Sequence, residues 1–162
     1  EIYRLYYKSM YNSSLMIVGV PEEAEDMMQE SFLTAFRNLR TYSGEVSFGA
    51  WLKKIVINRS LDALRKRKVI FEELHAEFPL VEDEEPESIT VEEVQAAINS
   101  LSDGYRTILS LILLEGYDHE EVSEILGIKN VTSRTQYSRA RQRLREILTD
   151  NRKKLLEERI YG

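Results

Sequence analysis

The sequence predicts an all-α protein built from two small helical domains that are joined by an acidic linker. Apolar residues recur at spacings of three and four in both halves of the chain, which is the period of an α-helix. Two capping-box pairs mark helix starts in the second half, and a proline-containing acidic segment separates the halves. At 162 residues, the chain is long enough for two domains of about 70 residues, each with a small core.

The first domain, residues 1–70, is predicted to contain three to four helices, and the sequence locates three of them. Ile2–Val18 is apolar and aromatic at helical spacing. A second helix should begin at Pro21, because proline suits the first helical turn, and run to about Asn38. Its expected buried face comprises Ala24, Met27, Met28, Ser31, Phe32, Ala35 and Phe36.

A loop at Arg40–Val46 precedes the third helix, which Ser47 can cap and which should run to about Lys68. The triplet Ile55-Val56-Ile57 consists of β-branched residues, which also favour strands. Because strand-like alternation does not continue on either side of the triplet, a helix is favoured.

The third helix is strongly basic and begins beside three aromatic residues. Seven lysines and arginines fall between positions 53 and 68, against a single acid, Asp62. Rings stack on bases and cations follow phosphates, so this combination suits a nucleic-acid strand whose bases are unpaired. Phe48 and Trp51 lie on the apolar stripe and are expected in the core, which leaves Tyr42, in the loop, as the better candidate for a base contact.

The acidity of the chain is confined to its middle. The net charge is −6 overall, but it is +3 for residues 1–70, −11 for residues 71–103 and +2 for residues 104–162. Residues 71–90 contain two prolines and lack sustained helical periodicity, so we expect a linker there. Two mildly basic ends around an acidic middle indicate that the chain has both negatively and positively charged partners.

The second domain, residues 91–162, is also predicted to be helical. The pairs Thr90/Glu93 and Asp118/Glu121 have capping-box spacing. Ser102 or Asp103 can start a helix between the two capped ones, and Gly116 ends it. The predicted helices are Val91–Leu101, Tyr105–Leu114 and Asp118–Leu126, followed by a basic helix after a break at Gly127–Asn130.

The last two helices form a helix-turn-helix pattern. Two helices joined by a tight turn that contains glycine, with the basic charge on the second helix, are typical of DNA-binding proteins. We expect Asn130 to cap the basic helix, and Ile128 and Val131 to lie in the core beside the turn. The sequence leaves open whether Asp150–Gly162 extends the helix or frays. Before Glu146 the helix has no acid, and it carries Arg134, Arg139, Arg141, Arg143 and Arg145.

Side chains near the start of such a helix reach base edges in the major groove. Arg134 can donate two hydrogen bonds to a guanine, whereas a solvated basic surface is the plainer interpretation of an arginine run. Short side chains that allow close approach are Thr132, Thr135 and Ser138. Residues placed for phosphate contacts are Lys129, Arg141, Arg143 and Arg145.

Several classes of function are excluded or disfavoured by composition. The chain has no cysteine, which excludes disulfides and thiolate zinc sites and fits a reducing, cytoplasmic compartment. Its longest apolar run is far shorter than a membrane span, so no membrane insertion is expected. His75 and His119 are isolated, and no catalytic constellation is present, so we predict neither a metal, nor another cofactor, nor an enzyme. The chain begins at Glu1 rather than Met, so we expect its natural start to lie further upstream.

Three segments together resemble a bacterial RNA polymerase sigma factor of the extracytoplasmic-function (ECF) group. They are Ala24–Leu39, Ser47–Lys68 and the helix-turn-helix segment Gly116–Arg145, in this order and separated by an acidic linker. The resemblance implies a promoter-specificity subunit that binds core RNA polymerase through its clamp helices and flap. It also implies promoter DNA as a partner, DNA melting, and an anti-sigma factor as a further partner.

The resemblance also assigns residues to roles by position. The polymerase-facing positions are Asp26, Gln29, Glu30 and Phe32. The positions for the melted −10 element are Tyr42, Asn58, Arg59, Asp62, Arg65 and Arg67. The positions for the −35 element are Thr132, Arg134, Thr135, Ser138, Arg139 and Arg141. The chain departs from the family pattern at Val131, where a glycine is usual, and at Ser133, where a branched apolar residue is frequent, so the angle of the recognition helix is not fixed by the resemblance.

Two questions stay open at this level. A stand-alone helix-turn-helix regulator with a helical sensor domain would need no polymerase surface, and Asp26, Gln29 and Glu30 would then be ordinary exposed residues. The acidic linker could follow a path lined for RNA, or its charge could simply keep it soluble. We also hypothesise that the linker folds onto the basic helices in the free protein and weakens DNA binding.

Overall fold

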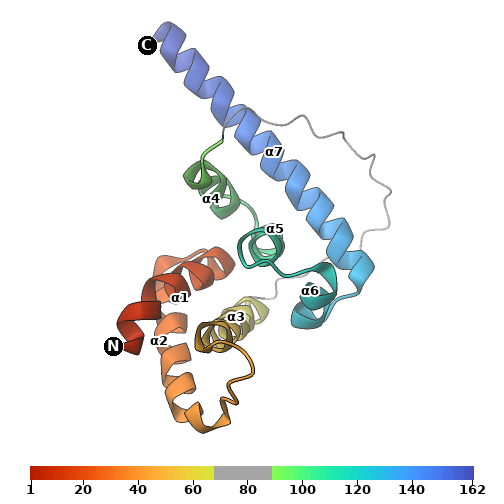
Figure 1. Ribbon diagram of the computed structural model, residues 1–162. Coiled ribbons are helices and arrows are strands. Elements are labelled where there is room, and N and C mark those ends of the chain that lie inside the picture. Colours follow the sequence, from red (N-terminus) through yellow and green to blue (C-terminus); the bar gives the residue numbers. More distant parts are fainter. Residues whose placement is uncertain (68–88) are drawn as a thin grey trace. The chain divides into compact units, whose positions relative to one another are not determined.

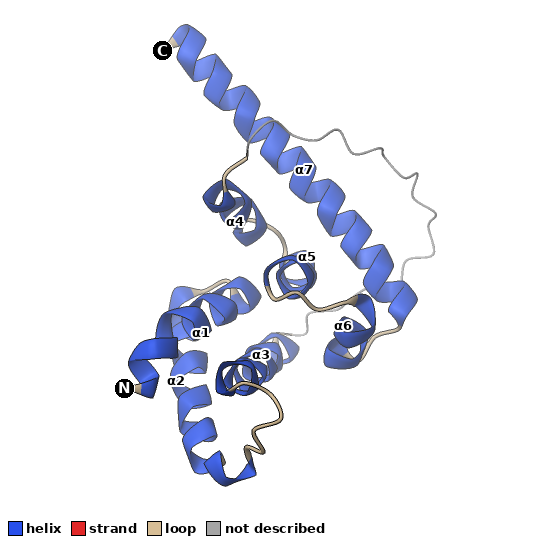
Figure 2. Cartoon of the chain, viewed as in Figure 1, coloured by secondary structure: helices blue, strands red, loops and turns tan. Residues whose placement is uncertain are grey.

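The computed structural model describes residues 1–67 and 89–162, which fall into two compact units, Glu1–Ile70 and Phe71–Gly162 (Figure 1). Every regular element in these two ranges is a helical segment, and none is a strand (Figure 2). The predicted all-α class, with two helical domains, is therefore confirmed. The prediction of a linker at residues 71–90 falls almost wholly on residues outside the described ranges.

The first unit contains the three predicted helices, α1 (Ile2–Val18), α2 (Pro21–Arg37) and α3 (Phe48–Lys66), with a short 3-10 turn after α2. Pro21 occupies the first turn of α2, as its fixed backbone angle predicts. The Ser47 hydroxyl accepts a hydrogen bond from the Ala50 amide at 3.2 Å and so caps α3. The helix assignment over the β-branched triplet is confirmed.

The core of the first unit lies between these three helices. Aromatic side chains of α1 and α3 pack around it, and the buried Ser14 and Ser60 hydroxyls bond to each other at 2.7 Å. Gly49 lets α1 approach closely, because a Cβ there would lie 2.9 Å from Tyr6 Cε1. One predicted core residue is wrong: Phe36 is exposed, one residue before the end of α2. The buried cluster comprises Met10, Met28, Phe32, Ala35, Leu52 and Val56.

The second unit contains α4 (Val91–Asn99), α5 (Asp103–Leu109), α6 (His119–Leu126) and α7 (Asn130–Tyr161). A π-helical turn, Ser110–Leu114, continues α5. Both predicted capping boxes are present, at the starts of α4 and α6. The backbone and side-chain hydrogen bonds from Thr90 hold the pKa of the Glu93 carboxyl below its ordinary value.

The core of the second unit is mainly apolar, and among the described residues it includes a buried arginine. Ile98, Ile108 and Val122 are fully buried between the helices. Arg106 is also buried, but it is paired with Asp103 and donates to the Leu101 carbonyl at 3.3 Å. These partners satisfy a charge that would otherwise be costly in the core, and they fix the junction between α4 and α5.

Helix α7 begins one residue earlier than predicted. Lys129, not Asn130, is the N-cap residue, and no side chain caps the helix. Asn130 is the first helical residue, and its Oδ1 accepts a hydrogen bond from Arg134 Nε at 2.7 Å. Val131 was predicted in the core but is 66% exposed. The residues of α7 that pack inward begin with Thr132 and Ser133. Helical spacing then places Val131 on the opposite side of the helix.

The open question about the C-terminal tail is answered by the length of α7. The helix continues to Tyr161 over 32 residues, which corresponds to about 48 Å. Its last turns carry exposed Leu155, Leu156 and Ile160.

Candidate nucleic-acid interface

The helix-turn-helix consists of α6, a three-residue break and α7. Gly127 ends α6 in the left-handed conformation, with φ 66° and ψ 35°, and its amide donates to the Ser123 carbonyl. The Ile128 amide donates to the same carbonyl at 3.0 Å. Glycine adopts this conformation without the Cβ penalty of other residues, so the chain can turn sharply into α7.

The N-terminal half of α7 is amphipathic, with a polar buried side. Its buried residues are Thr132, Ser133, Gln136, Ala140 and Leu144. The opposite side presents Val131, Arg134, Thr135 and Ser138 at spacings of three and four, and we call these four residues the recognition face. A helix with this exposed face can enter the major groove of DNA.

Two of the four residues on the recognition face are held by their own helix. The Asn130 side chain orients Arg134, and the Thr135 hydroxyl donates to the Val131 carbonyl at 2.9 Å. Asn130 is neutral, so it positions the Arg134 guanidinium without cancelling its charge. Ser138 is exposed beside them.

The other predicted −35 residues lie away from the centre of this face. Arg139 and Arg141 are half-buried at its borders, and the Arg141 guanidinium lies over the Tyr137 ring at 6.0 Å from the centroid. Thr132 is only 5% exposed. Its side chain packs in the domain core, so this structure does not present it to a base.

Val131 is a candidate contact that the sequence analysis missed. It precedes Arg134 and Thr135 by three and four residues, and this spacing was the signal that could have identified it. Its exposed methyl groups can contact the C5 methyl of a thymine.

His119, predicted to be isolated, joins the two helices of the motif. Its Nδ1 lies 2.9 Å from the Ser133 hydroxyl, and its ring meets the Tyr137 ring edge-on, with centroids 5.3 Å apart. Burial and the nearby Arg134 guanidinium lower the pKa of His119 below its ordinary value, and Asp118 opposes them. The imidazole is therefore neutral at pH 7.

In the first unit, α3 presents a separate stripe that begins at the half-buried Trp51 and is otherwise exposed. Asn58 is exposed on it, and the Arg65 guanidinium bonds to Asp62 at 2.6 Å. The helical spacing of seven residues places Asn58 two turns from Trp51, or about 10 Å along the axis. The stripe consists of Trp51, Lys54, Asn58, Asp62 and Arg65.

Tyr42 belongs to an aromatic cluster at the start of α3. Its ring lies edge-on to Phe48, with centroids 5.7 Å apart, and 5.2 Å from Trp51. Its hydroxyl donates to the Val46 carbonyl at 2.5 Å. All three rings are half-buried. Phe48 and Trp51 pack against the core, as expected, and Tyr42 extends the cluster into the loop.

Arg59 and Arg67, predicted as strand contacts, pair with residues of the other helices of the first unit in the free chain. Arg59 donates to the Thr34 hydroxyl at 2.7 Å and lies 3.5 Å from a Glu30 oxygen. Arg67 pairs with Glu23 and donates to the Val18 carbonyl at 2.9 Å. Arg67 thereby ties the end of α3 to α1 and α2.

The outer face of α2 carries three of the four predicted polymerase-facing residues. Asp26, Gln29 and Glu30 are exposed there, and Leu33 follows them on the same face; it is 54% exposed and was not singled out from the sequence. The fourth, Phe32, is 3% exposed and packs in the core, with its ring 4.8 Å from that of Tyr3. An exposed apolar residue beside polar ones is typical of a protein-binding surface.

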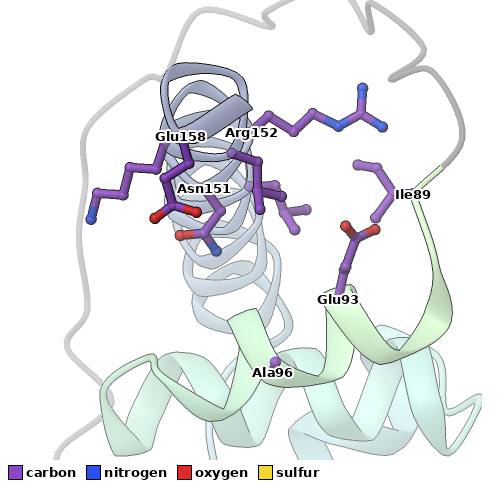
Figure 3. A pocket seen from close by; sticks show the side chains of 9 residues that line it. Ile89, Glu93, Ala96, Asn151, Arg152 and Glu158 are labelled. Carbon is purple, nitrogen blue, oxygen red and sulfur yellow. The ribbon is translucent and has the colours of Figure 1, made fainter. Parts of the chain in front are cut away.

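A groove of about 330 Å³ lies between α4 and the C-terminal half of α7 (Figure 3). Asn151, within it, follows Arg134 by 17 positions in α7, or about 25 Å along the axis, so the groove is distinct from the recognition face. It is lined by Ile89, Glu93, Ala96, Leu148, Asn151, Arg152, Lys154, Leu155 and Glu158.

Among residues 1–67 and 89–162, no group of three or more histidine, cysteine, aspartate and glutamate side chains could hold a metal ion. Within the same residues, no helix has the length and apolar character needed to cross a membrane.

Comparison with known proteins gives matches to both units. The family model for Sigma-70 region 2 matches residues 2–69, and that for Sigma-70, region 4, matches residues 91–144. The chain is 33% identical over 156 residues to the ECF RNA polymerase sigma factor SigE of Mycolicibacterium smegmatis, covering 91% of this chain and 60% of the relative. It is 28% identical over 165 residues to SigW of Bacillus subtilis, covering 93% and 88%.

A solved structure supports the fold. The sigma factor RpoE, crystallised with the anti-sigma factor NepR from Bartonella quintana, aligns with a TM-score of 0.61 and 24% identity, covering 91% of this chain and 94% of that one. Two helical units, one with a helix-turn-helix and both with a basic exposed helix, define a DNA-binding transcription protein. The chain belongs to the sigma-70 family, in the ECF group of RNA polymerase sigma factors. It spans 60% of the length of the first relative named above.

Proposed function

We propose that this protein is a promoter-specificity subunit that binds core RNA polymerase and directs it to a class of promoters. The observation that carries the proposal is that one chain combines two helical units with different exposed surfaces, and that these units match the two family regions in order. One is the helical recognition face of α7, which suits duplex DNA. The other is the aromatic cluster with the α3 stripe, which suits an unpaired strand.

The recognition face contacts the −35 element as duplex. Arg134 donates to a guanine edge, Thr135 and Ser138 line the approach, and Val131 contacts a thymine methyl. Arg139 and Arg141, at the borders of the face, contact phosphates. Thr132 acts from the core, by holding α7 in place.

The first unit binds the melted −10 element. Tyr42 and its neighbouring rings stack on an extruded base, and Asn58 hydrogen-bonds to a base edge. Arg59 and Arg65 contact phosphates after leaving Glu30 and Asp62, their partners in the free chain. Extruding a base costs a few kcal/mol, so stacking and polymerase contacts must offset that cost.

Core polymerase binds through two surfaces. The outer face of α2, with Asp26, Gln29, Glu30 and Leu33, receives the clamp helices. The groove between α4 and α7 receives an apolar element of the flap, because it is open, partly apolar and remote from the recognition face (Figure 3). The protein contributes no catalytic group, and nucleotide addition is performed by the polymerase. An anti-sigma protein is a further partner, as NepR is for RpoE in their complex.

Transcription in vitro tests the proposal. Core polymerase alone and core polymerase with the protein are compared on a promoter library, and the transcript starts are sequenced. We expect a new set of start sites whose upstream DNA shares two conserved blocks. A protein that binds duplex DNA but neither binds core polymerase nor changes the start sites is a stand-alone regulator, and the proposal would then be rejected.

A further inference from the structure

The joint between the two helices of the helix-turn-helix is polar where apolar packing was expected. Ser133 is completely buried on the inner side of α7, next to the buried Thr132 and Gln136. Its hydroxyl meets the imidazole of His119, the first residue of α6, at 2.9 Å. A hydrogen bond prefers a narrow range of distance and angle, whereas apolar contacts tolerate sliding. This bond therefore specifies how α7 is rotated and inclined against α6.

The surroundings of His119 favour a bond to a neutral ring. Its ring is partly buried against Tyr137, and the charged groups facing it are Asp118, at the cap of α6, and Arg134, on α7. Burial and Arg134 lower the pKa of His119, so one ring nitrogen carries no hydrogen at pH 7. Leaving the buried Ser133 hydroxyl without this partner would cost more than the bond contributes, which makes the pairing restrictive.

We propose that His119 is a positioning residue for base recognition: its bond to Ser133 sets the orientation in which Val131 and Arg134 meet the DNA. The inference rests on the proposed function of α7 as the reader of the −35 element. His119 itself needs no contact with a base. It acts through Ser133, which lies between Val131 and Arg134 in sequence but on the buried side of the helix.

Two substitutions at His119 separate the hydrogen bond from the ring contact. His119→Asn retains a hydrogen-bonding atom at the δ position and loses the ring that meets Tyr137. His119→Phe retains the ring and loses the bond. Ser133→Ala removes the bond from the other side. The matched control is Ser123→Ala, also in the helix-turn-helix, because the Ser123 hydroxyl bonds only locally, to the Glu120 carbonyl at 2.7 Å in the same helix.

The experiment selects duplex DNA from a randomised library with the full-length chain and each variant, and sequences the bound fraction. For His119→Phe, Ser133→Ala and their double variant, we expect the same loss of discrimination at the bases read by Arg134, about fivefold, the lower end of what an arginine–guanine contact contributes. His119→Asn and the Ser123→Ala control should keep the wild-type preference. Thermal melting of each variant identifies any that is simply unfolded.

Each result counts for or against the inference. If His119→Phe keeps the preference and His119→Asn loses it, the ring contact rather than the bond orients α7, and the proposal is wrong. It is also wrong if the folded variants bind all sequences more weakly by one common factor, or if the effects of His119→Phe and Ser133→Ala add. If the wild-type chain has no base preference on duplex DNA, both the proposed −35 reading and this inference fail. If His119→Phe and Ser133→Ala both keep the wild-type preference, this inference is wrong and the proposed reading of the −35 element stands.

Discussion

The pairing of Arg59 with Glu30 leads to a prediction in which one substitution has opposite effects on two partners. Arg59 is a proposed phosphate contact, and Glu30 lies on the proposed polymerase face of α2. In the free chain the two side chains lie 3.5 Å apart. Strand phosphates and Glu30 therefore compete for the same guanidinium. Glu30→Gln should strengthen the binding of a single-stranded oligonucleotide to the free chain and weaken the binding of core polymerase.

The magnitude follows from the exposure of the pair. The Arg59 and Glu30 side chains are 43% and 52% exposed, so solvent screens their attraction. Exposed pairs of this kind contribute about 0.2–1 kcal/mol. Releasing Arg59 should therefore tighten oligonucleotide binding by at most about fivefold. The bond from Arg59 to Thr34 remains in the variant and limits the gain further.

Fluorescence anisotropy of a labelled single-stranded oligonucleotide measures this effect, at low salt and again at physiological salt. Glu25→Gln is the matched control, because it removes the same charge from α2 while Glu25 is bonded to the neutral Gln29 at 3.4 Å. The gain should be absent when Arg59 is also replaced by glutamine. Equal gains for Glu25→Gln and Glu30→Gln would refute the reasoning, since the effect would then be general charge. No gain for Glu30→Gln would refute it as well.

Three further predictions concern the second unit. Arg134→Ala should weaken binding to the preferred −35 sequence by about 1–3 kcal/mol in a competition assay, and an equal loss on unrelated DNA would make Arg134 a phosphate contact. Replacing each −35 thymine by deoxyuridine should weaken binding of the wild-type chain at one position and leave Val131→Ala unchanged there, because only the methyl group differs. The pKa of His119 lies below its ordinary 6.5, so the unfolded state binds the proton more readily. The free energy of unfolding should therefore keep its full His119 contribution above 6.5 and lose it as the pH falls through the folded pKa, which denaturation of wild-type and His119→Phe chains at about pH 7.5 and 5.5 can measure.

Helix positions were predictable because they depend on local signals. The aromatic and apolar spacing of Ile2–Val18 gave both ends of α1, and Pro21 and Ser47 placed the starts of α2 and α3. The capping boxes placed α4 and α6 in the same way. These signals act within one turn of helix, so they need no knowledge of the tertiary packing.

The burial of individual residues near the turn was not predictable from polarity. Val131 is apolar and exposed, whereas Ser133 and Gln136 are polar and buried. A pattern that places apolar residues inside assigns these three residues to the wrong sides. Phe32 is the opposite case, because the apolar spacing of α2 correctly predicted its burial, whereas its place in the family pattern suggested a partner surface.

The contacts of the arginines explain why the two proposed DNA surfaces differ in the free chain. On α7, Arg134 is oriented by the neutral Asn130 and keeps its full charge for DNA. On α3, Arg59 and Arg65 are paired with the acids Glu30 and Asp62. Phosphates must displace those acids. Each new contact therefore stabilises the complex only by the difference in free energy between two exposed ion pairs.

It follows that the first unit gains little affinity for a strand from its arginines alone. Binding there must come from base stacking on the Tyr42 cluster and from a partner that removes Glu30 from Arg59. Core polymerase bound to the outer face of α2 would be such a partner, because Glu30 belongs to that face. By this argument the free protein distinguishes duplex −35 sequences through α7, whereas tight capture of the melted −10 strand requires the polymerase.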